Sequence, residues 1–167
     1  MTISDAQREQ LSYYVCGKIS EKNLDEYVRK NFLQIQEIKE IRRDVVENLQ
    51  YAEYYAGKGL VNLLIKPIED IEKLLKRINL FIPPTLKNNI IKIGLINGIP
   101  MEYKYLSMAL NANDNIGIQQ HWKFFSNYIL MLDSYFGNNA LSKGEMMVLE
   151  RWKGEYFKLK NFFENRK

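Results

Sequence analysis

The helix-breaking residues of this chain are gathered in its middle. All four prolines lie between Gly57 and Pro100, in a segment rich in Ile and Leu whose ionisable side chains are mostly lysine. Because proline removes a backbone donor and interrupts a helix, this segment predicts short helices joined at angles. The chain on either side shows long amphipathic patterns instead. A broken, aliphatic, basic centre between regular helices is where a groove or docking surface could form.

A long helix is expected before this segment. No Gly or Pro occurs between Ser20 and Gly57, and apolar residues recur there with a period near 3.5. The pattern predicts one helix over about 21–56, or two collinear ones, with a single seam toward the core. The seam residues are Leu24, Val28, Ile35, Ile38, Val45, Leu49, Ala52 and Ala56.

The rest of the chain also reads as helical. Two further long helices are expected, over about 116–136 and about 143–163, the second opening on a capping box of Ser142 and Glu145. Between 58 and 110, Gly57, Gly59, Pro67, Pro83-Pro84 and the Asn97–Pro100 turn sequence delimit short helices. No segment shows the alternation of a strand. The predicted fold is all-α: a bundle of about six or seven helices in a single domain over 1–167.

Charge and cysteine content narrow the cellular setting. Residues 58–110 carry eight Lys/Arg against four Asp/Glu, so the middle holds most of the net charge of +4. The single cysteine, Cys16, excludes an intramolecular disulfide and fits a reducing compartment. The N-terminus lacks the features of a secretory signal, and no apolar run approaches the roughly 20 residues that span a bilayer. We expect a cytoplasmic protein without a transmembrane segment.

Patterns for catalysis and metal binding are weak. The only histidine, His121, is preceded three positions earlier by Ile118, so the Glu-x-x-His pair of a di-iron bundle is missing. One Cys and one His cannot form a structural zinc site unaided. Cys16 lies at the end of a predicted helix, where the helix dipole disfavours a thiolate. We therefore predict no catalytic residue, no metal and no cofactor, and expect a non-enzymatic protein.

Residues 85–110 have part of the pattern of a DNA-binding helix-turn-helix. Gly94 and Gly98 have the required spacing, but Lys104 and Ser107 occupy positions of the second helix that should be buried. That helix also offers no Arg to contact guanine. Nucleic-acid binding through the basic 58–110 segment stays as an alternative function. A small-molecule sensor with an aromatic pocket between helices is a further alternative.

We favour a helical protein–protein interaction or regulatory protein. Its partner would be a protein that is contacted through helix faces, and a homodimer is compatible with this hypothesis. The candidate binding residues are basic residues of the middle segment and aromatic residues outside the main apolar stripes of the last two helices. They are Lys66, Lys73, Arg77, Lys87, Lys92, Phe124, Tyr135 and Phe157.

Overall fold

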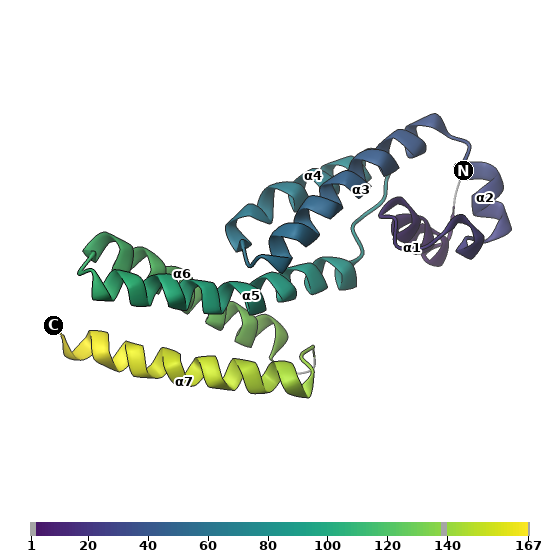
Figure 1. Ribbon diagram of the computed structural model, residues 1–167. Helices are drawn as coiled ribbons and strands as arrows, with labels where there is room; N and C mark the ends of the chain where they lie inside the picture. The colour runs from purple at the N-terminus through teal and green to yellow at the C-terminus, as the bar shows by residue number, and fades with distance from the viewer. Residues whose placement is uncertain (1–2, 138–139, 167) are drawn as a thin grey trace. The chain divides into compact units, whose positions relative to one another are not determined.

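The computed structural model describes residues 3–137 and 140–166. These residues form seven α-helices and two short 3-10 helices, with no strand in the described part, which confirms the prediction of an all-α fold. In chain order the elements are α1 (Asp5–Val15), η1 (Glu21–Asn23), α2 (Glu26–Phe32), α3 (Gln36–Gly57), η2 (Val61–Leu63), α4 (Ile65–Arg77), α5 (Pro84–Asn111), α6 (Asn115–Phe136) and α7 (Lys143–Asn165) (Figure 1).

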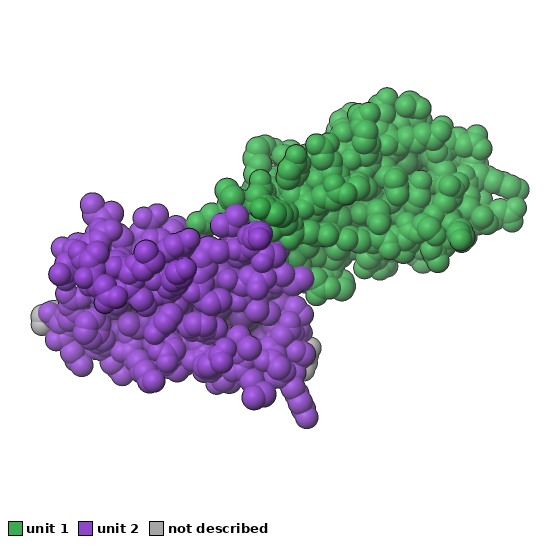
Figure 2. Space-filling model, in the orientation of Figure 1, with its two compact units in different colours: residues 1–55, 62–91 green, residues 56–61, 92–167 purple. Residues whose placement is uncertain are grey.

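The chain divides into two compact units (Figure 2). Unit 1 consists of residues 1–55 and 62–91, and unit 2 of residues 56–61 and 92–167. Helices α1, α2 and α4 belong to unit 1 and α6 and α7 to unit 2, whereas α3 and α5 contribute residues to both. Two helices, α3 and α5, continue through the division between the units. The single domain expected over 1–167 stays a prediction.

The expected long helix over 21–56 is wrong in its first half, where the chain forms η1, α2 and only then α3. Asp25 is extended, and its carboxylate accepts hydrogen bonds from the Val28 backbone N–H (2.8 Å) and from Gln7 Nε2 (2.9 Å). These bonds cap the start of α2, and a helix running through Asp25 would lose them. Leu24, beside the break, is 3% exposed and turns into the core.

The predicted seam nevertheless forms the core of unit 1 along most of its length. Val28, Ile38, Val45 and Leu49 are all buried. Ile35 is the exception: it is 41% exposed, because it lies in the non-helical stretch before α3. The spacing of apolar residues therefore identified the buried side of this segment better than it identified the helix ends.

Helix α5 is one continuous helix of 28 residues that contains Pro100, so the turn expected at Asn97–Pro100 and the two short helices expected on either side of it are wrong. Helix α4, with 13 residues, is a short helix of the expected kind. The reason that α5 continues is a close chain approach within unit 2. The Asn97 side chain donates to the Ala56 carbonyl (3.1 Å), and a Cβ at Gly98 would lie 3.0 Å from the Gly59 carbonyl oxygen. Gly98 is thus a small helical residue that admits the neighbouring segment, and its role is packing rather than turning.

Helices α6 and α7 lie side by side and match the predicted ranges 116–136 and 143–163 to within two residues (Figure 1). The capping box of Ser142 and Glu145 is present. Trp122 of α6 stacks on Tyr156 of α7 with ring centroids 5.5 Å apart. Within α7, Leu149 is the one buried residue, so the packing of this helix on the rest of unit 2 depends strongly on that side chain.

We expect Leu149→Ala to lower the free energy of unfolding of unit 2 by about 3 kcal/mol, because a fully buried leucine leaves a cavity. Both tryptophans, Trp122 and Trp152, belong to unit 2, so their fluorescence during urea denaturation reports this unit. Leu159→Ala, at a half-buried position of the same helix, is the control and should cost about 1 kcal/mol. Equal losses in the two variants would contradict the packing described.

We expect Gly59→Ala to destabilise unit 2 by about 2 kcal/mol or more. Gly59 has φ +72°, and a Cβ there would lie 2.6 Å from the Asn97 carbonyl oxygen, so backbone strain and a clash with main chain coincide. Gly154→Ala is the control: nothing lies within 4 Å of its Cβ position inside α7. It should stabilise by about 1 kcal/mol, again read by tryptophan fluorescence in urea.

Candidate functional site

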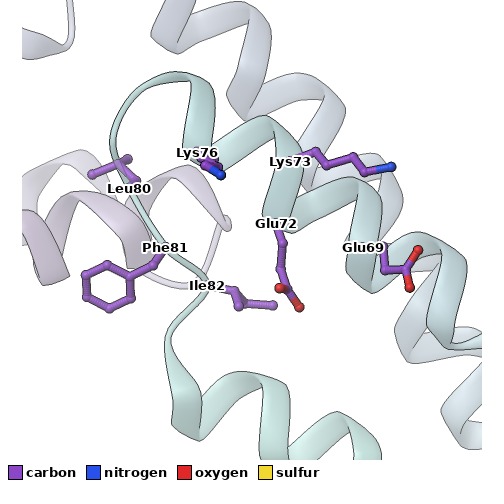
Figure 3. A pocket seen from close by; sticks show the side chains of 7 residues that line it. All are labelled: Glu69, Glu72, Lys73, Lys76, Leu80, Phe81 and Ile82. Atoms are coloured by element: carbon purple, nitrogen blue, oxygen red, sulfur yellow. The ribbon is translucent and has the colours of Figure 1, made fainter.

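A hollow of unit 1 lies between α4 and the linker that follows it. It has a volume of about 440 Å³. We call it the α4–linker hollow. It is lined by Glu69, Glu72, Lys73, Lys76, Leu80, Phe81 and Ile82 (Figure 3). Charged side chains of α4 form one side, and the apolar linker forms the other.

The amphipathic sequence of α4 places the charged side of this hollow outward. Pro67, Ile68, Ile71 and Leu75 are buried against unit 1. Pro67 is tolerated because it lies in the first helical turn, where a backbone N–H has no partner within the helix. Burial of this apolar stripe leaves the ionisable residues of α4 on the opposite side, at the protein surface.

The way in which α4 ends explains why the Phe81 side chain is exposed at the surface. Asn79 adopts a left-handed conformation (φ 58°), and the Leu80 N–H donates to the Leu75 carbonyl (2.9 Å), which stops the helix and reverses the chain. In the extended linker, alternate side chains then face opposite ways. Leu80 and Ile82 are each 7% exposed, whereas Phe81 is 46% exposed. In Figure 3 the Ile82 side chain extends toward Glu72, while the Phe81 ring extends away from it.

A second depression runs between α3 and α4, and we call it the α3–α4 groove. It has a wider part of about 470 Å³ and a narrower part of about 190 Å³, which share Asn48, Tyr51 and Asp70. From α3 it is lined by Asp44, Glu47, Asn48, Tyr51 and Tyr55. From α4 it is lined by Lys66, Pro67, Asp70, Lys73, Leu74 and Arg77. Lys73 lines both the groove and the α4–linker hollow.

The structure brings three predicted basic residues, Lys66, Lys73 and Arg77, together on the exposed side of α4. Four of the five predicted basic residues are held close to carboxylates, which reduces the positive field they project. These pairs are Lys66–Asp70 (3.1 Å), Arg77–Glu37 (3.7 Å), Lys87–Glu72 (2.9 Å) and Lys92–Glu145 (3.3 Å).

Lys92 is separate from the others, because it lies in unit 2 and its side chain is only 17% exposed. Besides its ion pair with Glu145, it donates to the Ala140 carbonyl (3.3 Å). Lys92 therefore connects α5 to the beginning of α7. This arrangement suits a structural residue better than a binding residue.

The predicted aromatic residues all lie in unit 2 and differ in their surroundings. Tyr135 of α6 is 73% exposed and Phe157 of α7 is 53% exposed. Phe124 is half-buried and stacks on Tyr128 with centroids 6.1 Å apart. Sequence reasoning missed Tyr51 and Phe81. The signal for Phe81 was available, since an apolar Leu-Phe-Ile run between Asn79 and the Pro83-Pro84 pair is typical of an extended linker.

Groups with resolved pKa shifts have structural explanations. Burial raises the pKa of the Cys16 thiol to about 11 and that of Tyr128 to about 12. The backbone N–H of Val28 lowers the pKa of Asp25, which caps α2. Across the described ranges, no group of three or more His, Cys, Asp or Glu side chains is arranged to hold a metal ion.

The one histidine also has a defined partner. His121 Nδ1 of α6 lies 2.6 Å from Glu102 Oε2 of α5, and its ring packs against Tyr105 with centroids 5.4 Å apart. Both partners are largely buried, with side chains 26% and 13% exposed. The pair connects two helices of unit 2, which is the interhelical role expected of a lone histidine between packed helices.

None of the helices in the described part is both long and apolar enough to cross a membrane. No protein-family model, no curated protein and no solved structure matches this chain. An all-α fold does not specify an activity, so the surface of the molecule is what bears on its function.

We expect the stability of unit 2 to fall in acid partly through Glu145. A hydrogen bond from the Ser142 backbone N–H, and then Lys92, hold the pKa of Glu145 below its ordinary 4.5. The stabilisation is therefore complete above pH 4.5 and is lost as the pH falls through the folded-state pKa. Glu145→Gln removes this charge, so the difference in unfolding free energy between wild type and variant should narrow from pH 6 to pH 3. Tryptophan fluorescence in urea measures it, and a constant difference would contradict the assignment.

Proposed function

We propose that this chain is a non-enzymatic interaction protein, and that it recognises a partner protein through the α4–linker hollow. The observation that carries the proposal is the exposed Phe81 ring, which lies between two buried aliphatic neighbours in the linker of a hollow whose other side carries α4 side chains of both charges. Protein interfaces typically have an apolar centre with aromatic anchors and a charged rim. The hollow has this composition.

The charges around the hollow indicate what kind of partner fits. Glu69 and Glu72 carry negative charge, and Lys73 and Lys76 carry positive charge, all on α4. A complementary partner would insert an apolar side chain beside Phe81 and present charges of both signs around it. Charges of this kind contribute more to specificity and association rate than to affinity.

The two alternative functions fit the hollow less well. A small-molecule site is usually enclosed and mainly apolar, whereas four of the seven lining residues here are charged. A nucleic-acid site needs basic groups free to replace phosphate counterions. Most of the predicted basic residues are instead paired with carboxylates, as at Lys87 and Glu72.

The test is site-specific photo-crosslinking in the cells that make the protein. A photoreactive phenylalanine analogue at position 81 should give a discrete crosslinked protein. The same analogue at position 27 is the control, because Tyr27 is a similarly exposed aromatic residue (42%) of unit 1 that lies outside the hollow. Identical products from both positions, or none from position 81, would refute the proposal.

A binding measurement with the partner identified by crosslinking then gives the contribution of Phe81 to the binding free energy. Phe81→Ala should weaken binding by about 2 kcal/mol or more, as expected for an aromatic anchor, while Tyr27→Ala should leave it unchanged. Thermal melting followed by circular dichroism checks that both variants fold. The nucleic-acid alternative makes a different prediction: the protein should shift mixed DNA or RNA in a mobility assay at low salt. It is correct if Lys73→Glu abolishes that shift and Phe81→Ala does not.

A further inference from the structure

The charges of the α3–α4 groove are separated by helix. The lining residues of α3 include two carboxylates, Asp44 and Glu47, and no basic residue. Those of α4 include three cations, Lys66, Lys73 and Arg77, and one carboxylate. Asp44 is paired with Arg43 (3.3 Å), Lys66 with Asp70 (3.1 Å) and Arg77 with Glu37 (3.7 Å). The difference in charge between the two edges therefore rests mainly on Glu47 of α3 and Lys73 of α4.

The two edges also match in position along the groove. Helices α3 and α4 run in opposite directions, since Glu37 near the start of α3 pairs with Arg77 at the end of α4 (3.7 Å). Glu47 and Lys73 line the same wider part. Glu47 of α3 and Lys73 of α4 thus lie on the two edges of the same part of the groove.

We propose that a second copy of this chain docks on the α3–α4 groove, around a two-fold axis that runs along the groove. Such an axis places α3 of each copy over α4 of the other, so the α3 carboxylates of one copy meet the α4 cations of its partner twice. An axis across the groove would instead place α3 on α3, with carboxylates facing carboxylates. The charge pattern favours the first arrangement. This proposed dimer does not depend on which partner binds the α4–linker hollow.

An aromatic residue adds to the contact at the narrower end. Tyr51 is 51% exposed and stacks on Tyr55 with centroids 6.4 Å apart. Lys66 and Pro67 line the same narrow part from α4. In the two-fold arrangement each Tyr51 ring would cover Lys66 and Pro67 of the other copy, where a cation and a flat apolar ring suit an exposed tyrosine.

The dimensions of the groove predict a weak dimer. Helix α4 has 13 residues. At 1.5 Å per residue it is about 20 Å long, and two adjacent helices give a footprint of roughly 400 Å² per copy. Specific complexes typically bury about 800 Å² per partner, so the dimer should form only at high concentration. Its exposed ion pairs should also make it sensitive to salt.

Sedimentation equilibrium of the full chain over a concentration series tests the proposal. We expect reversible dimers that weaken as salt is raised. Lys73→Glu and Glu47→Lys should each weaken self-association by about tenfold, because each places like charges opposite each other twice. Mixing the two variants should restore association as a heterodimer, since the reversed charges are then complementary. Only an intermolecular contact between these two edges produces this rescue.

Lys22→Glu and Glu21→Lys are the matched controls, with the same charge changes at exposed positions of η1 away from the groove. They should dimerise as wild type does. A monomer at every concentration overturns the proposal, and so does a dimer that the two groove variants leave unchanged. Neither result bears on the Phe81 crosslink, so failure here is separable from failure of the proposed function.

Discussion

Burial of the apolar stripe of α4 determines where the candidate binding residues of unit 1 lie. Once Ile68, Ile71 and Leu75 pack inward, the charged residues of α4 have no place except the surface. The same burial positions the linker, because the chain reverses at Asn79 directly after the stripe ends. Both the α4–linker hollow and the α3–α4 groove follow from this packing, and they adjoin on the exposed side of α4, where Lys73 lines both.

Much of the fold could be predicted because it is locally encoded. The Ser142 cap and its partner Glu145 are three residues apart, and the start of α7 follows from that spacing. The break before α2 could not be found this way. Asp25 is fixed partly by Gln7, which is 18 residues away in the sequence, and periodicity carries no information about such a contact.

Helix α5 was mispredicted for a different reason. Its sequence carries a strong local signal for a turn, and tertiary contacts override that signal. Asn97, Gly98 and Pro100 together favour a turn in any isolated sequence. In unit 2 the side chain of Asn97 instead binds the Ala56 carbonyl, and the missing Cβ of Gly98 makes room for Gly59. The helix continues through Gly98 and Pro100 although a glycine disfavours a helix interior by roughly 1 kcal/mol and a proline by roughly 3 kcal/mol. This result also removes the turn on which the helix-turn-helix hypothesis depended.

The residues of the candidate site could be predicted from the sequence only in part, because their ion-pair partners depend on tertiary contacts. Composition located the basic residues of α4, but it could not show that Lys66 and Arg77 are paired with Asp70 and Glu37. A charge count over residues 58–110 therefore overstates the field that this surface projects. What the surface retains is an ordered arrangement of both charges around exposed aromatic rings. Charges arranged in this way give selectivity by position and sign rather than by net attraction, which is why we propose a protein partner rather than a uniformly charged polymer.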